Sequence, residues 1–131
     1  MRDRPTLTSA DVAKIMDACK RKAAADHLNV AIAIVDDAGF LLSVERLDGA
    51  SRVAGEVALG KARTAALMRR PSALMQTLVD EHPAMASLPY IMPITGGLPI
   101  VHKNECVGAV GVSGALSEQD VQIAQAGIDA V

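Results

Sequence analysis

The sequence predicts an α+β fold in which one antiparallel sheet is flanked by helices. Two stretches have the pattern of β-hairpins, and helical stretches precede, separate and follow them. No internal repeat or linker interrupts this order. With 131 residues the chain has the usual size of one domain, so we treat residues 1–131 as a single domain.

The first helix is predicted from about Ser9 to Asp26. Thr8 and Asp11 form a capping box, in which a hydroxyl and a carboxylate each bond a free backbone amide at the helix start. Apolar residues then recur at helical spacing, which predicts one buried face: Val12, Ile15, Met16, Cys19 and Ala23.

A first hairpin follows this helix. Val30 to Val35 and Phe40 to Leu47 have strand character, and the turn between them contains Asp36 and Asp37. Carboxylates in turns usually bond local backbone amides. We therefore interpret these two aspartates as turn residues and not as a pair of catalytic acids.

Two further helices are predicted, from Arg52 to about Arg69 and from Ser72 to about Glu81, with Ser51 and Ser72 as their caps. The longer one has a face of alanine and glycine, which lets a helix lie close to a sheet or to another helix. An irregular segment from His82 to Pro93 follows, and a further short strand is expected within Tyr90 to Thr95. Long loops inside compact domains are often functional.

The second hairpin is the most distinctive stretch of the chain. Its predicted strands are Leu98 to Val101 and Cys106 to Val112, joined by a polar tip at His102 to Glu105. Glycine inside a strand weakens it and marks a bend or the close approach of a ligand or backbone. We therefore expect a pocket wall where glycines precede the first strand and run along the second: Gly96, Gly97, Gly108, Gly111 and Gly114. A last helix opens at Ser117 to Asp120, a second capping box.

Composition excludes several classes of function. Only 2% of the residues are aromatic, the net charge is -2, and no basic tract occurs, which argues against nucleic-acid partners. No apolar run reaches the ~18 residues that a membrane helix needs, and no apolar stretch follows Met1, so we expect a cytoplasmic protein. Cys19 and Cys106 are isolated and have no metal-site spacing, so both are interpreted as core residues.

Taken together, these motifs resemble the GlcG/HbpS-like family, also called the haem-degrading or DUF336 domain, which also occurs at the C-terminus of PduO-type proteins. The resemblance covers nearly the whole chain in the right order. Besides the first capping box, it is carried by these segments: Val35 to Gly39, Arg46 to Gly49, Gly60 to Ala65, Gly96 to Ile100 and Val107 to Gly114.

The resemblance implies a profilin-like sheet with helices on both faces and assembly into homo-oligomers. Some family members bind haem and are associated with its degradation, others bind corrinoids, and many are encoded in catabolic operons. It therefore implies a small organic ligand, with haem as the candidate cofactor. The ligand-binding candidates lie in the glycine hairpin and upstream of it: Arg63, Thr64, Tyr90, Gly96, Gly97, Leu98, Pro99 and Ser113.

A haem binder needs an axial ligand and a large apolar slot. The candidate ligands include His82, His102 and Tyr90, although His102 belongs to the predicted hairpin tip and is interpreted as exposed surface. His82 precedes Pro83 at the end of a predicted helix, where it is either a site residue or a helix cap. The scarcity of aromatic residues counts against a porphyrin sandwich.

The alternative is an enzyme, an isomerase, dehydratase or hydrolase, acting on a small carbonyl or carboxylate metabolite. His82 would serve as a base near neutral pH and Lys61 as a positive charge, while the Gly96 and Gly97 amides would form an anion-binding nest. A serine hydrolase is disfavoured, because the stretch around Ser113 lacks the last glycine of the nucleophile motif. A non-catalytic sensor or assembly module is the third possibility.

Overall fold

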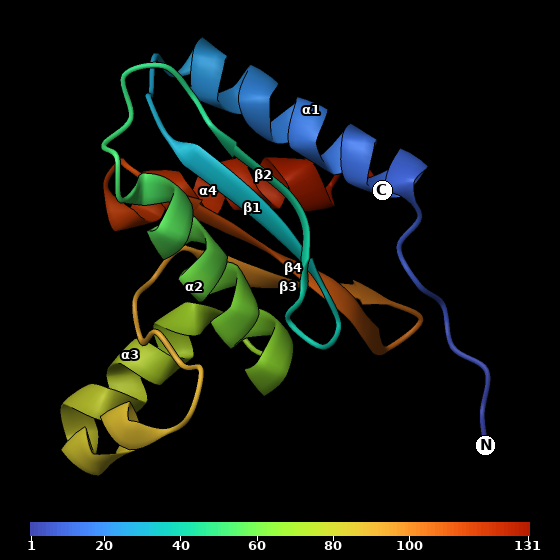
Figure 1. Ribbon diagram of the computed structural model, residues 1–131, viewed down its shortest axis with the longest axis vertical. Helices are drawn as coiled ribbons and strands as arrows, with labels where there is room; N and C mark the ends of the chain where they lie inside the picture. Colours follow the sequence, from blue (N-terminus) through green and yellow to red (C-terminus); the bar gives the residue numbers. More distant parts are fainter.

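The computed structural model describes residues 1–131 and contains four α-helices, one 3₁₀ helix and four strands (Figure 1). Its elements are, in chain order, α1 (Ser9–Ala25), β1 (Ala31–Asp36), β2 (Leu41–Arg46), α2 (Ala54–Met68), α3 (Ser72–Glu81), η1 (Pro83–Ser87), β3 (Gly97–His102), β4 (Glu105–Ser113) and α4 (Ser117–Ile128). The α+β class and the antiparallel sheet are confirmed, and the arrangement is consistent with a profilin-like fold.

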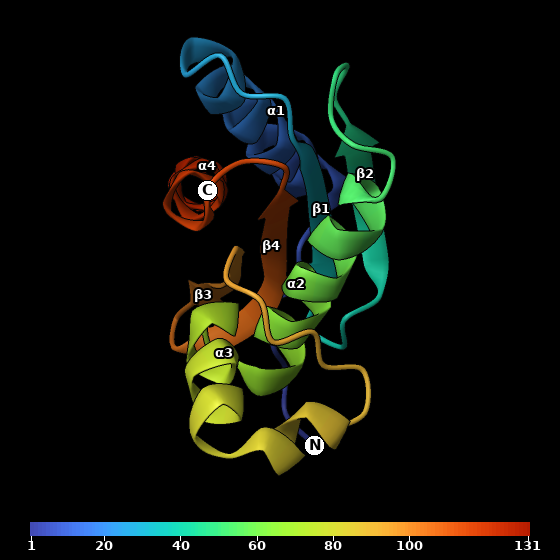
Figure 2. The same cartoon turned by 90° about the vertical axis from the view of Figure 1, so that its left-hand side faces the viewer.

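The four strands form one antiparallel sheet in the order β2-β1-β4-β3. The two hairpins therefore lie side by side, joined through their inner strands β1 and β4. In the centre of the sheet, Ala33 of β1 is paired with Val44 of β2 on one side and with Gly111 of β4 on the other. The sheet separates two helical layers (Figure 2).

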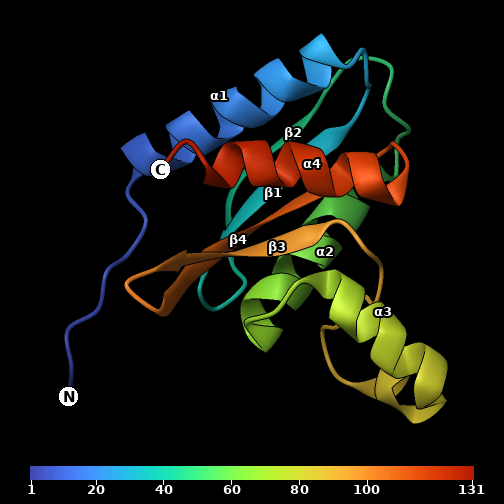
Figure 3. The ribbon, with the colours of Figure 1, turned by 180° about the vertical axis from the view of Figure 1, so that it is seen from behind.

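One layer consists of α1 and α4, which lie next to each other over the same face of the sheet (Figure 3). This face is packed with branched aliphatic side chains, such as Ile15, Ile32 and Ile123, all with no exposed surface. Each such side chain contributes about 1.5–3 kcal/mol through removal from water. On the strands, β-branched residues such as Ile32 favour the extended backbone, and on strands and helices alike these side chains fill the core densely.

The other layer is α2, which lies across β1 and β4 on the opposite face. Here eight of the nine residues of the buried cluster are alanine, the ninth being Val35: Ala31, Ala33, Ala54, Ala58, Ala62, Ala65, Ala66 and Ala109. The small side chains allow the helix backbone to approach the strands. A Cβ atom at Gly111 would overlap the carbonyl oxygen of Ala58, so the helix occupies the space that this glycine leaves free.

Both hairpin predictions are confirmed. The turn of the second contains Lys103 and Asn104, both with left-handed backbone (φ +49° and +64°), as a two-residue turn matched to the twist of its strands requires. In the first hairpin, Asp36 Oδ1 accepts hydrogen bonds from the amides of Ala38 and Phe40, each at 2.9 Å. The interpretation of Asp36 as a turn residue is therefore confirmed.

Three predicted caps are wrong in detail. Ser51 does not cap α2, which begins after Val53 without any side-chain cap. Ser72 is the first residue of α3 rather than its cap, because its hydroxyl bonds the chain that enters β3. At α4 the amides of Ala115 and Leu116 are bonded by Asp120 Oδ1 and Gln119 Oε1, each at 3.1 Å, so Ser117 has no capping role.

Two smaller predictions also fail. No strand forms within Tyr90 to Thr95, because Pro93 interrupts the segment and side chains of α2 and α3 hold it in place of a neighbouring strand. Cys19 is buried as expected, whereas Cys106 at the start of β4 is only half-buried. None of the helices combines the length and the apolar character needed to cross a membrane.

Candidate functional site

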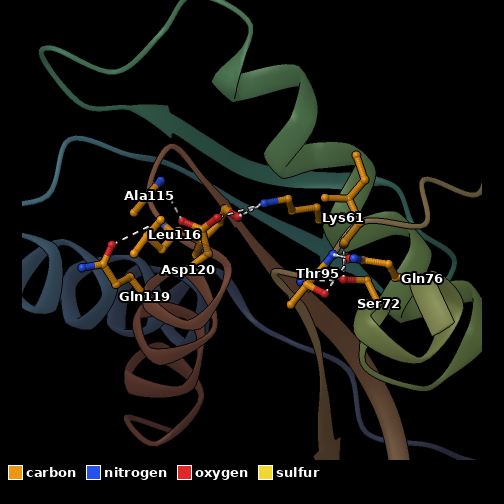
Figure 4. A network of polar contacts seen from close by, with 11 residues as sticks. Lys61, Ser72, Gln76, Thr95, Ala115, Leu116, Gln119 and Asp120 are labelled. Carbon is orange, nitrogen blue, oxygen red and sulfur yellow. Dashed lines mark hydrogen bonds and ion pairs between the residues drawn. The ribbon is translucent and has the colours of Figure 1, made fainter.

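A buried ion pair connects the two helical layers. Lys61 of α2 and Asp120 of α4 are only 4% and 2% exposed, and Lys61 Nζ lies 3.0 Å from Asp120 Oδ2. The same ammonium donates to the carbonyl oxygen of Val112 at 2.9 Å (Figure 4). Every polar atom of the pair that is buried therefore has a partner, as buried charges require.

Gly96 makes room for this lysine. Its backbone is left-handed (φ +135°), and a Cβ atom there would lie 2.7 Å from Lys61 Nζ and 2.8 Å from Lys61 Cδ. Any larger residue would therefore combine backbone strain with a collision. The neighbouring Gly97 lies against the Lys61 carbonyl, and its amide donates to Ser72 Oγ at 2.8 Å.

Burial raises the pKa of Asp120, and the bonds from Lys61 and the Ala115 amide offset this effect only in part. The pair is thus a costly buried element, and its loss on one side would leave an uncompensated charge. Its geometry describes an internal tie between α2, β4 and α4, and Lys61 lines neither of the two cavities described below.

Side chains of α2 and α3 hold the segment that leads into β3. Ser72 Oγ donates to the Ile94 carbonyl at 2.6 Å, and Gln76 Oε1 accepts from the Thr95 amide at 2.9 Å (Figure 4). On α2, Thr64 Oγ1 accepts a hydrogen bond from the Met92 amide at 2.8 Å. The segment is therefore fixed on the helices although it has no regular structure.

The larger cavity, about 510 Å³, lies beside the turn of the β3-β4 hairpin, and we call it the hairpin cavity. Seven of its twelve lining residues are hydrophobic: Pro5, Thr6, Leu7, Asp11, Lys14, Ile100, Val101, His102, Val107, Ile128, Ala130 and Val131. Its walls thus include residues from both ends of the chain: the C-terminus lies beside the start of α1, and the N-terminal segment runs past the hairpin turn (Figure 3). Its volume is typical of small-molecule sites.

The polar groups of the hairpin cavity are Asp11, Lys14 and His102, apart from the hydroxyl of Thr6. Hydrogen bonds from the Thr8 amide and hydroxyl lower the pKa of Asp11, and the charges of Lys14 and His102 add to the effect. A cation, an imidazole and an apolar wall are therefore present together in one cavity.

The smaller cavity, about 320 Å³, lies along α2 and is lined by Glu56, Leu59, Gly60, Arg63, Tyr90, Ile91 and Met92. We call it the α2 cavity. It brings together two ligand-binding candidates, Arg63 and Tyr90. Thr64 lies one residue further along α2 and fixes Met92, a residue of the opposite wall.

The other candidates are dispersed. Leu98 packs against the core under α1 and α4, and Pro99 is a half-buried residue of the edge strand β3. Ser113 ends β4 half-buried. His82 is exposed beyond the last residue of α3 and lines neither cavity. The catalytic roles of His82 and Lys61, and ligand binding by Gly96 and Gly97, stay predictions.

Two groups escaped the sequence analysis. Asp120, the partner of Lys61, was interpreted only as part of a capping motif, and it does bond the amide of Ala115. An acid within a capping motif gives no sign of a second, long-range partner. His102 is exposed at the tip as expected, but it also lines the hairpin cavity with Lys14, a juxtaposition that depends on where both chain ends lie.

Comparison with known proteins gives a consistent result. Residues 7–129 match the family model described as "Haem degrading protein HbpS-like". Protein GlcG of Escherichia coli strain K12 is 35% identical over 114 residues, which cover 86% of this chain and 85% of GlcG. A 15.0 kDa protein from the dhaT-dhaS intergenic region of Citrobacter freundii is 31% identical, with 95% and 91% covered.

Solved structures agree closely with the fold. A crystal structure of HbpS, 30% identical, has a TM-score of 0.93 and aligns with 100% of this chain and 94% of its own. The DUF336 protein ORFY of Klebsiella pneumoniae, 27% identical, has a TM-score of 0.92 with 99% and 93% covered. A complex named PduOC:Heme, 26% identical, has a TM-score of 0.90 with 97% and 96% covered.

Proposed function

We propose that this protein, which belongs to the HbpS-like family, binds haem in the hairpin cavity. The observation that supports this most is the combination of an apolar cavity of about 510 Å³ with an imidazole on its wall. The PduOC relative, similar along nearly the whole chain, has been crystallised with haem. Histidine is a common axial ligand of haem iron, and the macrocycle needs an apolar slot.

The residues present fit this group. His102 would hold the iron, and apolar side chains such as Ile100 and Val107 would contact the ring. Lys14 is the cation of the cavity, and it would pair with a propionate, an anionic group at the edge of haem. Bound haem would supply a redox-active iron. The protein's part is to bind it, orient it and keep water from one side.

Titration with haemin tests the proposal, and the chain makes the control simple because it has three histidines: His27, His82 and His102. The wild type should give a saturable Soret band. His102→Ala should shift the band and weaken binding, while His27→Ala and His82→Ala should leave both unchanged. An unsaturable wild-type titration would contradict haem binding, and an effect confined to His82→Ala would move the site to His82, the other candidate ligand in the sequence.

Haem degradation, the activity in the family description, is the further part of the proposal. Incubation of the haem complex with ascorbate in air should bleach the Soret band and release iron, which a ferrous chelator detects. The His102→Ala variant and haemin without protein are the controls. A band that persists in the wild type as long as it does in free haemin would contradict degradation and leave binding intact.

We also propose that the protein assembles with itself through β2. This strand pairs only with β1, so its outer edge is free, and three of its apolar residues, Leu41, Leu42 and Val44, are 43–48% exposed. The opposite edge, β3, contains Pro99, which cannot donate to a further strand. An open apolar edge is suited to strand pairing with another chain.

Light scattering coupled to gel filtration measures this assembly. Val44→Lys should lower the mass of the particle, because it places a charge in the expected contact. Leu74→Lys, at a residue of similar exposure (45%) on α3, is the matched control and should leave the mass unchanged. A monomeric wild type, or an unchanged mass in Val44→Lys, would contradict assembly through β2.

A further inference from the structure

We infer that the α2 cavity is a second ligand site, separate from the hairpin cavity, and that it takes a small organic monocarboxylate. The two cavities share no residue, and they lie on different parts of the fold. This inference does not depend on haem binding, and either one can fail without the other.

The anchor of the site is Arg63. Its Nε donates to the carbonyl oxygen of Gly39 at 3.1 Å, and its Cγ lies where a Cβ atom of Gly39 would be only 2.9 Å away. The turn of the first hairpin thus fixes the guanidinium from one side. Gly39 also has left-handed backbone (φ +84°), so glycine is required there for two reasons.

The guanidinium has unused capacity. Its Nε bond is its single hydrogen bond in the structure, and none of the ion pairs involves Arg63. Arginine stays charged at any physiological pH, and its fork of terminal nitrogens matches the two oxygens of a carboxylate. A half-buried, positioned arginine without a counter-ion, on the wall of a cavity, indicates an anionic ligand.

The opposite wall is held in place. Thr64 Oγ1 bonds the Met92 amide, and Met92 in turn fills the space beside Gly60, where a Cβ atom would lie 2.5 Å from its terminal methyl. Two residues before Met92, Tyr90 has left-handed backbone (φ +62°), a strained conformation for an aromatic residue. Such strain persists where the surrounding structure enforces it, and it gathers at ligand sites. Tyr90 is 77% exposed and lines the cavity.

The lining also defines the class of ligand. Leu59, Ile91 and Met92 offer apolar contact, which suits a hydrocarbon part beside the carboxylate. Glu56 lies two turns before Arg63 on the same helix and lines the same cavity. Its negative charge disfavours ligands with two or more negative charges, such as dicarboxylates and phosphates. A monocarboxylate with an apolar body would pair its charge with Arg63 and place its hydrocarbon part against the apolar lining.

Three probes of one shape test the inference by amide chemical shifts in ¹⁵N-labelled protein: benzoate, benzyl alcohol and benzylamine. Benzoate should give saturable shifts at residues 56–63 and 90–92, with affinity in the millimolar range expected for so small a ligand. Benzyl alcohol should bind about tenfold more weakly, because it lacks the charge-assisted bonds. Equal shifts from all three probes, or stronger binding of benzylamine, would overturn the assignment.

Variants identify the anchor. Arg63→Gln should weaken benzoate binding about tenfold or more, whereas Arg52→Gln, an exposed arginine just before α2, should leave it unchanged. Glu56→Gln should strengthen it, since a repelling charge is removed. Circular dichroism checks that the variants fold, and Tyr90→Ala provides a second variant on the opposite wall, with weaker benzoate binding expected. Unchanged binding in both Arg63→Gln and Tyr90→Ala would overturn the site.

Discussion

The two faces of the sheet are packed by opposite rules. Toward α1 and α4, β1 presents branched side chains such as Ile32 and Ile34, which keep the helices at the distance of a full side chain. Toward α2, the same strand presents Ala31 and Ala33, and β4 adds Gly111, so that helix and strand backbones come into contact. One face is stabilised by large branched side chains, and the other by small residues that let the helix backbone pack directly on the strands.

This difference explains the glycines of the second hairpin. Glycine in a strand indicates a close approach, and the sequence left open whether a ligand or another subunit approaches. For Gly97 and Gly111 the approaching group is α2 of the same chain. These two glycines therefore serve the packing of α2 against the sheet, and no glycine of the hairpin lines either cavity. Larger residues should accordingly destabilise the face under α2, and smaller residues the face under α1 and α4.

The largest effect is expected at Gly111. Valine there would place its Cβ atom on the Ala58 carbonyl oxygen and 2.5 Å from the Ala62 amide, both backbone atoms that cannot turn aside. Because even a modest overpacking costs about 1–3 kcal/mol, we expect Gly111→Val to yield no stable folded protein, as judged by thermal melting and soluble yield.

Gly55 supplies the matched control on α2, since a Cβ atom there meets nothing within 4 Å. Gly55→Ala should leave stability unchanged or raise it by up to about 1 kcal/mol through helix propensity. A well-folded Gly111→Val variant would break the comparison of the two faces.

The next largest effect is expected from breaking the Lys61–Asp120 ion pair, which connects the two faces of the sheet. Lys61→Met removes the partner of a buried carboxylate, which should lower the free energy of unfolding by about 4 kcal/mol at neutral pH. The pKa of Asp120 is already raised by burial and should rise further without Lys61. The folded variant therefore favours the protonated acid, so its deficit should be smallest in acid and grow as the pH rises through that pKa.

Urea unfolding at acid and neutral pH measures this deficit. The double variant Lys61→Met, Asp120→Leu should recover part of the loss, because it leaves no unpaired charge. A deficit that is larger in acid than at neutral pH would show that the buried carboxylate is not its cause.

Ile32 tests the face of branched side chains. It is fully buried under α1 and α4, so Ile32→Ala should cost about 3 kcal/mol through lost burial and the cavity left behind. On the other face the corresponding fault is a gain of volume: Ala62→Leu should be the harmful change there, while Ala62→Ser should be much milder. If chemical denaturation showed a larger loss of unfolding free energy in Ala62→Ser than in Ala62→Leu, packing by close approach would be contradicted.

The smallest effect concerns reactivity rather than stability. Cys19 lies in the core beside Gly127, and burial raises the pKa of its thiol to about 12. Cys106 is half-buried. Iodoacetamide should therefore modify Cys106 first, because the thiolate is the reactive form, and mass spectrometry of digested protein locates the label. Equal labelling of Cys19 in folded protein would show that the α1–α4 face opens readily.

Local signals were enough to predict most of the fold. Hydrophobic period, Thr8 with Asp11 at the first helix, and the Asp36 turn each depend on residues close in sequence, and each is confirmed. One wrong detail, the cap of α3, has a long-range cause. The hydroxyl of Ser72 looks like a cap in sequence, yet it is used by Ile94 and Gly97 some twenty residues away.

The site was less predictable, because its parts meet only through the tertiary fold. Arg63 and Tyr90 were chosen and do lie in one cavity. In contrast, the hairpin cavity joins Leu7, His102 and Ile128, which come from the start, the late hairpin and the end of the chain. No spacing in the sequence links such residues, and only the sheet order β2-β1-β4-β3 brings them together.

We infer that ligand approaches the hairpin beside its turn, in the hairpin cavity, and not at its glycines. Ferric haem is paramagnetic, so it broadens the amide signals of nearby residues in ¹⁵N-labelled protein. We predict loss of signal at Leu7, Val101, His102 and Ile128, with the amides of Gly97 and Gly111 less affected. Broadening centred on Gly96 and Gly97, or on His82 beyond α3, would contradict the account.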